Sequence, residues 1–224
     1  MNDKRPQLAR DDIFVNPIYR GHDPQFLYLD KECDSIIENI KKQNQIKLQN
    51  GDIKTLPNSY HSENLWEHAK FQPFIQFVMK QMWDILSSQG YDLKGRQPLL
   101  QECWVQEFPE EGGFHDIHIH PNNHMSGFYF LKCTPETSRP SFHDPRPGKT
   151  MTDLKPVEKS KVNVCNSQVH YPVKPGQFIF FNSWMPHAYS HHKGKEKFRF
   201  IHFNMAAALQ QSSVQNADKV SEVK

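Results

Sequence analysis

The strongest constraint on the fold is a series of short apolar segments in the second half of the chain. Each segment is rich in aromatic and β-branched residues, and Pro, Gly, Asn or Asp separates it from the next. This pattern predicts β-strands, and in no stretch between the segments do apolar residues recur at helical spacing. The predicted strands are residues 99–108, 114–120, 125–133, 138–143, 169–173, 177–182, 188–192 and 197–205. About eight strands in roughly 110 residues favour an all-β sandwich or jelly roll.

Two helices are predicted before the strands, over about residues 30–45 and 71–88. Their apolar residues recur at helical spacing and form one stripe on each helix, which is typical of packing elements. We therefore expect a mainly β fold, a jelly roll braced on one face by two N-terminal helices. The expected organisation is helical support over 1–95 within the same domain, a jelly-roll catalytic core over 96–208 and a flexible tail over 209–224.

Composition and charge limit the classes of function. Lys plus Arg number 27 and Asp plus Glu 25, and a net charge of +2 does not indicate a nucleic-acid partner. The apolar runs are far shorter than the roughly 20 residues of a membrane-spanning helix, and the charged N-terminus has no secretory pattern. The four cysteines are widely spaced and form no CxxC pair, which favours reduced thiols in a cytoplasmic protein over a disulfide framework or a cysteine zinc site.

Histidine marks the candidate site. The chain has 13 histidines, of which ten lie between His115 and His202. His118 and His120 are two residues apart on a predicted strand, so both side chains project from one face. His187 follows an apolar strand and a turn, which places it at a strand end, and histidine is the commonest metal ligand. We therefore predict one metal ion bound by His118, His120 and His187.

The order of these motifs resembles a known family. A Gly-rich lead precedes His118, a Lys-Pro-Gly turn at 174–176 opens an apolar strand, His187 follows, and Arg199 comes twelve residues later. This order is similar to the 2-oxoglutarate/Fe(II)-dependent oxygenases, prolyl 4-hydroxylase-like branch. The His-Ile-His-Pro-Asn and Asp-Pro-Arg motifs resemble more closely a phage and bacterial group of that superfamily. The resemblance covers about residues 99–207.

The resemblance implies a double-stranded β-helix, the jelly-roll form found also in cupins. It implies an oxidoreductase, a dioxygenase that uses Fe(II), 2-oxoglutarate and O₂ to hydroxylate a small-molecule or protein substrate. His118 and His187 then act at the catalytic iron. Arg199 offers a bidentate fork for the far carboxylate of 2-oxoglutarate, and the hydroxyl of Tyr129 adds to the same contact.

One position departs from the family pattern. The superfamily has Asp or Glu two residues after the first His, where this chain has His120. A neutral imidazole there leaves the iron site one unit more positive. Asp116 and Asp144 are alternative third ligands. Two other functions therefore stay open: a three-His cupin-type dioxygenase or isomerase that does not use 2-oxoglutarate, and a non-catalytic jelly-roll binding module.

Overall fold

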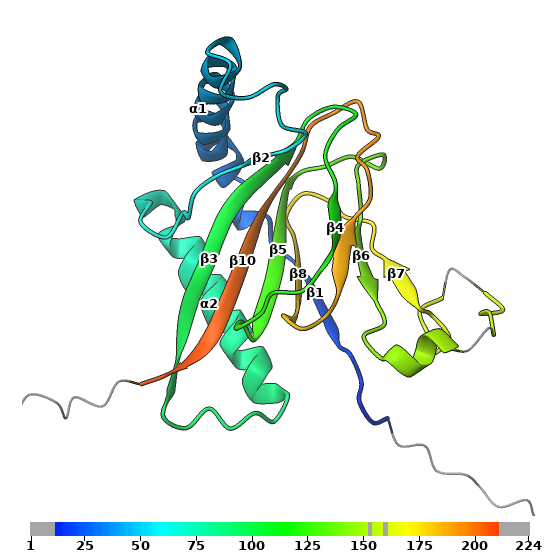
Figure 1. Cartoon of the computed structure of the whole chain (residues 1–224). Coiled ribbons are helices and arrows are strands. Elements are labelled where there is room, and N and C mark those ends of the chain that lie inside the picture. The colour runs from blue at the N-terminus through cyan, green and yellow to red at the C-terminus, as the bar shows by residue number, and fades with distance from the viewer. Residues whose placement is uncertain (1–11, 152–153, 159–160, 211–224) are drawn as a thin grey trace, which may run out of the picture.

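Two antiparallel sheets face each other in a computed structural model that describes residues 12–151, 154–158 and 161–210 (Figure 1). The larger sheet has the strand order β1-β8-β5-β10-β3-β2, and the smaller one has the order β4-β9-β6-β7. The strands are β1 (Ile18–His22), β2 (Tyr60–His61), β3 (Arg96–Phe108), β4 (His115–His118), β5 (Met125–Lys132), β6 (Pro140–His143), β7 (Gln168–His170), β8 (Gln177–Asn182), β9 (His187–Tyr189) and β10 (Phe198–Leu209).

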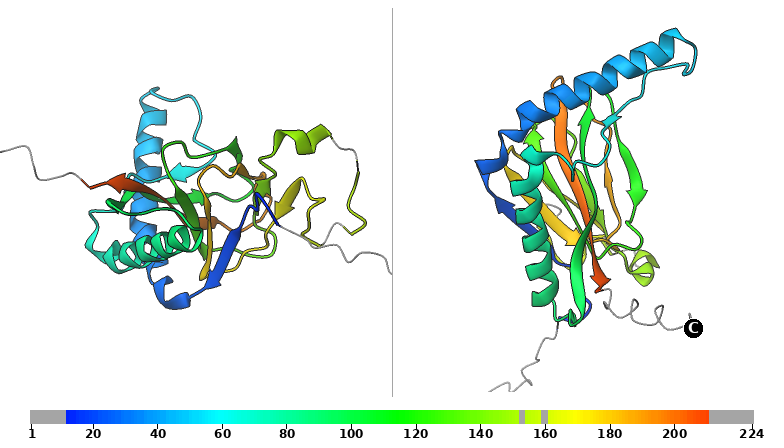
Figure 2. Two further views of the ribbon diagram at one scale, coloured as in Figure 1. Left: turned by 90° about the horizontal axis from the view of Figure 1, so that it is seen from below. Right: turned by 90° about the vertical axis from the view of Figure 1, so that its left-hand side faces the viewer.

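Two long helices cover the outer face of the larger sheet (Figure 2). They are α1 (Leu29–Gln49) and α2 (Gln72–Ser88), joined by short 3₁₀ turns at Pro24–Phe26 and Ala69–Phe71 to the segments before them, and a third turn lies at Pro147–Met151. Pro73 lies in the first turn of α2, where a missing N–H costs nothing. The predicted mainly β fold with two supporting helices is confirmed. The predicted tail lies largely outside the described residues.

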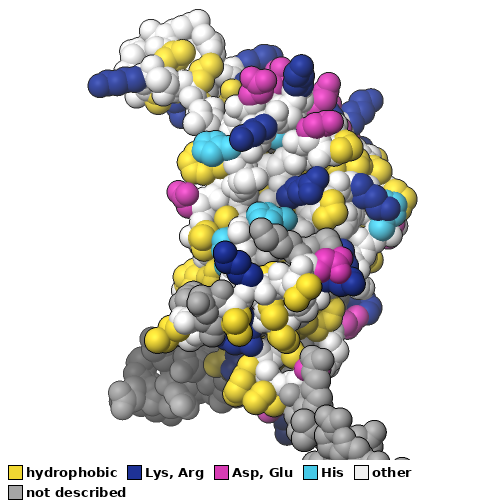
Figure 3. Space-filling model, turned by 90° about the vertical axis from the view of Figure 1, so that its right-hand side faces the viewer, with side chains coloured by type: hydrophobic (Ala, Val, Ile, Leu, Met, Phe, Trp, Pro, Cys, Tyr) yellow, Lys and Arg dark blue, Asp and Glu magenta, His cyan; other side chains and the backbone are white. Residues whose placement is uncertain are grey.

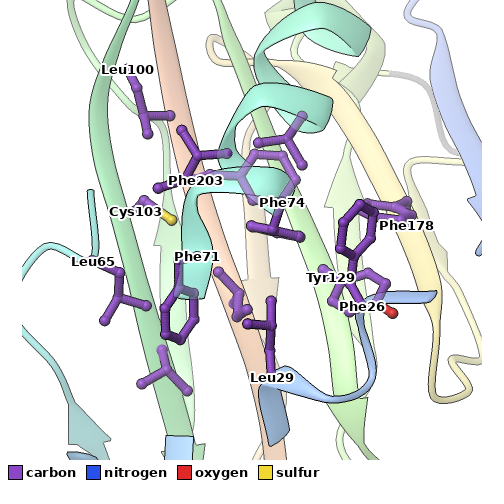
Figure 4. Close-up of a cluster of buried hydrophobic side chains, with 14 of the residues drawn as sticks. Phe26, Leu29, Leu65, Phe71, Phe74, Leu100, Cys103, Tyr129, Phe178 and Phe203 are labelled. Carbon is purple, nitrogen blue, oxygen red and sulfur yellow. The ribbon is translucent and has the colours of Figure 1, made fainter. Parts of the chain in front are cut away.

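The fold has two apolar cores, one on each face of the larger sheet. Between the helices and the sheet, Phe74 of α2 packs against Phe178 and Phe203 (Figure 4). Between the two sheets lies a second core made largely of aromatic rings, among them Phe128 and Phe200. Successive strand residues point to opposite faces, so β10 supplies both cores with alternate side chains. This alternation decides which residues can reach the space between the sheets.

Gly127 on β5 lies directly opposite Phe203 of β10, and its missing side chain is required by packing. A Cβ at this position would come within 2.7 Å of the Phe203 Cζ and 2.9 Å of the Ile179 carbonyl oxygen. We expect Gly127→Ala to destabilise the fold by about 1–3 kcal/mol, because overpacking forces buried neighbours to move. Urea denaturation measures the change. Gly21→Ala, in β1 with nothing within 4 Å of the added Cβ, is the control and should lose far less; equal losses would contradict the packing argument.

Candidate metal centre

Three histidines from two segments of the chain converge at one end of the smaller sheet. His118 ends β4 and lies opposite His187, the first residue of β9, in the antiparallel register. His120 follows β4, where its backbone N–H donates to the Ser183 carbonyl oxygen at 3.0 Å. One ligand nitrogen from each of the three rings lies within 4.8 Å of the other two. The ring centroids are 4.3 Å apart for His118 and His187, 5.0 Å for His118 and His120, and 5.1 Å for His120 and His187.

Hydrogen bonds orient two of these rings. The Nδ1 of His118 lies 2.7 Å from the Asp116 carbonyl oxygen, and the Nδ1 of His187 lies 3.0 Å from the Met185 carbonyl oxygen. A carbonyl oxygen only accepts, so Nδ1 carries the hydrogen in both rings. Each Nε2 then carries a lone pair, the form in which imidazole binds a metal, and the Nε2 of His187 faces the Nε2 of His120 at 3.3 Å.

Burial keeps the imidazoles neutral. His187 is 1% exposed, and burial, aided by the nearby His118, lowers its pKa to about 2. Burial also lowers the pKa of His120 to about 4, with further contributions from His118 and His115. The rings of Phe128, Phe142 and Phe181 pack against His187. At neutral pH these two histidines therefore present lone pairs, which suits a divalent metal.

A second group of potential ligands adjoins the first. Glu102 of β3, His120 and His202 of β10 also place one ligand atom each within 4.8 Å of one another. Glu102 and Asn204 are opposite residues of β3 and β10, and the Asn204 amide nitrogen donates to the Glu102 carboxylate. Glu102 was not among the ligands predicted from the sequence. Only the pairing of β3 with β10, which sequence spacing does not give, brings it here.

Neither aspartate considered as an alternative third ligand reaches these histidines. Among the described residues, the two groups of three potential ligands include neither Asp116 nor Asp144. Asp116 is exposed and contributes its backbone oxygen to His118. Asp144 forms an ion pair with Arg146 at 2.6 Å. Because neither carboxylate joins the group, His120 is the third side chain that converges with His118 and His187.

Arg199 lies on the face of β10 that is turned away from the three histidines. Its predicted role in binding the far carboxylate of 2-oxoglutarate is therefore corrected. Its guanidinium donates to Glu107 Oε2 at 2.9 and 2.6 Å and to Asp30 Oδ1 at 2.7 Å, and it lies 2.8 Å from Asp34 Oδ1. The side chain is 1% exposed, and it faces α1 rather than the space between the sheets. Lys41 of α1 joins the network through Glu107 at 2.8 Å. Arg199 is a structural cation that fastens α1 to the sheet.

Tyr129 also faces the helices, so its predicted contact with 2-oxoglutarate is corrected as well. Its hydroxyl donates to the Asp23 carbonyl oxygen at 2.9 Å, and its ring packs 4.3 Å from that of Phe178 and 5.5 Å from that of Phe74. The residue is fully buried in the core beneath α2 (Figure 4). Tyr129 therefore has a packing role.

Residues 102–204 match the sequence profile of a family described as "Putative 2OG-Fe(II) oxygenase". The matched region runs from β3 to β10 and contains the three converging histidines together with Glu102 and His202. The resemblance to the 2OG-Fe(II) oxygenase family is confirmed. No curated protein matches the chain.

Solved structures of other proteins share the fold of this chain. A non-heme monooxygenase, ThoJ, in complex with nickel has a TM-score of 0.55 at 8% identity, over 86% of this chain and 74% of that one. AviO1 from Streptomyces viridochromogenes has a TM-score of 0.50 at 11% identity, over 87% and 92%. A Trichoplax adhaerens prolyl hydroxylase in complex with a peptide fragment has a TM-score of 0.50 at 11% identity, over 86% and 84%. The fold is that of the double-stranded β-helix oxygenases.

Proposed function

We propose that this protein is a metal-dependent oxygenase whose Fe(II) is held by His118, His120 and His187. The convergence of three imidazoles, in a region that matches the 2OG-Fe(II) oxygenases, carries the proposal. When bound, an iron with three protein ligands supplies open coordination positions for O₂ and an oxidisable molecule. The donor set fits this metal, since imidazole suits Fe(II).

The protein residues around the metal ligands have two roles in this proposal. The carbonyl oxygens of Asp116 and Met185 fix the tautomers of His118 and His187, so that each Nε2 is ready to bind. The aromatic rings beside His187 keep water away from that face of the site. Orientation and exclusion of water therefore come from the fold itself.

The family implies 2-oxoglutarate as a cosubstrate, but the residues that were predicted to bind it do not fit that role. Arg199 is saturated by carboxylates on the far side of β10. The rings that pack against His187 are those of Phe128, Phe142 and Phe181, which carry no charge to pair with a carboxylate. This observation, with the three-His ligand set, favours a second candidate function: a three-His dioxygenase that does not use 2-oxoglutarate.

Calorimetry with Mn(II)-loaded protein, without oxygen, separates the two functions. Binding of 2-oxoglutarate, followed by succinate formation with Fe(II) and O₂, supports the 2-oxoglutarate oxygenase. Metal binding without any 2-oxoglutarate binding supports the three-His dioxygenase. A protein that binds no metal contradicts both and favours the binding module.

A groove that shares Phe142 and Met185 with the surroundings of His187 is the candidate entry for substrate, and none of the three metal ligands lines it. It has a volume of about 870 Å³ and is lined by Ile13, Phe14, Asp144, Arg146 and Met185. Hydrophobic side chains gather on the lower part of the face that carries β6 and β7, and charges of both signs are mixed above them (Figure 3). This mixture suits a small-molecule or protein substrate rather than a polyanion. Among the described residues no helix is long and apolar enough to cross a membrane, and a cytoplasmic location stays a prediction.

The metal assignment predicts the outcome of removing one ligand. His187→Ala should lose one equivalent of Mn(II) or Fe(II) relative to wild type, because two imidazoles alone hold a divalent ion weakly. His118→Ala, at a less buried position, should lose the same ion. Metal content is measured by mass spectrometry after anaerobic dialysis, with circular dichroism to confirm folding. His191→Ala, an exposed histidine, is the control; unchanged metal content in both ligand variants would sink the assignment.

A further inference from the structure

The two nitrogens of the His120 ring face two different groups. Its Nε2 lies 3.3 Å from the Nε2 of His187, within the three-His group. Its Nδ1 lies 3.2 Å from the amide nitrogen of Asn204, which also contacts Glu102. The ring of His202 packs against that of His120 with centroids 4.7 Å apart. One imidazole thus separates two clusters of potential ligands.

Two buried polar atoms in the second cluster have no hydrogen-bond partner among the described residues. They are the Nε2 of His202 and the Oδ1 of Asn204, in residues that are 3% and 0% exposed. Buried polar atoms without a partner are rare in folded proteins, because their desolvation is not compensated. Trp104 and Phe128 pack against the His202 ring and hold it in place. These orphaned atoms point to a group that the polypeptide itself does not provide.

The Asn204 amide occupies the position of a cation. Its nitrogen donates toward both the Glu102 carboxylate and the His120 Nδ1, two groups that offer lone pairs. A metal ion would accept a lone pair from each of the same two groups. Half a turn of the amide would then bring the orphaned Oδ1 to the ion as a further ligand, whereas without a cation that oxygen would repel the carboxylate.

We propose that Glu102, His202 and the Nδ1 of His120 form a second binding position for a divalent first-row transition metal ion. The inference rests on the proposed function in that His120 belongs to both positions. Two imidazoles and a carboxylate suit Fe(II), Mn(II), Co(II) or Zn(II). The position also contains the carboxylate that the three-His group lacks. If both ions bind at once, the shared imidazole releases its one N–H proton to solvent.

The test uses Mn(II) alone, under nitrogen, with the full chain. Bound equivalents are measured by equilibrium dialysis and mass spectrometry for wild type, His187→Ala, Glu102→Gln and the double variant. We expect His187→Ala to keep about one equivalent, and the added Glu102→Gln to weaken that remaining binding at least tenfold. The matched control adds Glu67→Gln, an exposed glutamate, to His187→Ala and should change nothing.

A variant that gains metal binding tests the proposal in a way that misfolding could not imitate. In the His187→Ala background, Asn204→Asp adds a second carboxylate beside Glu102 and should tighten Mn(II) binding about tenfold. Unchanged or weaker binding in this variant contradicts the proposal.

The failures of the two proposals are distinguishable. If His187→Ala holds no Mn(II), or if Glu102→Gln changes nothing in either background, the second position is overturned while the three-His site stands. If His187→Ala and His118→Ala match wild type while Glu102→Gln loses the metal, the three-His assignment fails and the Glu102 position is upheld.

Discussion

Arg199→Ala is expected to destabilise the fold by about 3–5 kcal/mol, the range seen when one partner of a buried ion pair is removed. The guanidinium is 1% exposed and the Glu107 carboxylate is fully buried. Burial alone would raise the pKa of Glu107, but the hydrogen bond from Lys41 and the charge of Arg199 outweigh it and hold that pKa below its usual value. Without Arg199 the carboxylate keeps only Lys41, so the loss should fall toward the lower end of the range.

Urea denaturation measures this loss, with Arg139→Ala as the control. Arg139 is exposed and makes only a long contact to a carbonyl oxygen, so its removal should cost less than about 0.5 kcal/mol. Removing both charges, as Arg199→Met with Glu107→Gln, should cost less than the sum of the single changes. If Arg199→Ala instead left stability intact and abolished 2-oxoglutarate binding, the role in cosubstrate binding predicted from sequence would be restored.

The error at Arg199 shows what the sequence of a strand cannot decide. Alternation along β10 puts residues 199, 201 and 203 on one face of the strand and residues 198, 200 and 202 on the other. Both sets contain aromatic residues. Hydrophobicity therefore does not say which set faces the space between the sheets. The pairing with β3 and the position of α1 decide it, and they depend on contacts distant in sequence.

Other parts of the fold could be predicted because their signal is local. The central strands β5 and β8 have continuous apolar runs, and His118 and His120 share a face by their spacing alone. β1 and β2 were not predicted: β1 has a mainly exposed sequence at the sheet edge, and β2 is two residues long. Glu102 was missed for the same reason as Arg199, since only the register between β3 and β10 brings it to the site.

The metal-free protein is expected to lose stability as the pH falls from 7.5 to 5.0. Burial lowers the pKa of His187 to about 2 and those of His115 and His120 to about 4, and it holds the pKa of His202 well below its usual value. In the unfolded chain these imidazoles take up protons near pH 6.5. Unfolding therefore binds protons below that pH, and stability falls as the solution becomes more acidic. His187 alone should account for about 2 kcal/mol at pH 5.

The range from pH 7.5 to 5.0 separates the contribution of the histidines to stability from that of the carboxylates. Glu107 and Asp34 have lowered pKa values, so their contribution to stability is fully present above their usual values and is lost only in more acidic solution. Between pH 7.5 and 5.0 the change in the free energy of unfolding, measured by urea denaturation, therefore reports on imidazoles. His187→Ala should show a smaller change over the same window, because one buried imidazole no longer resists protonation.

Metal should oppose this acid destabilisation. An ion that binds only the folded protein adds about 2.7 kcal/mol at a hundred times its dissociation constant, and a chelator removes that gain. Because His187 and His120 stay neutral in the folded protein throughout this window, protons do not compete with the metal for these two ligands, and the gain should be similar at pH 7.5 and at pH 5.0. If the metal-free protein were equally stable at both pH values, the buried histidines would take up protons in the folded state. The neutral ligand set proposed for His187 and His120 would then be wrong.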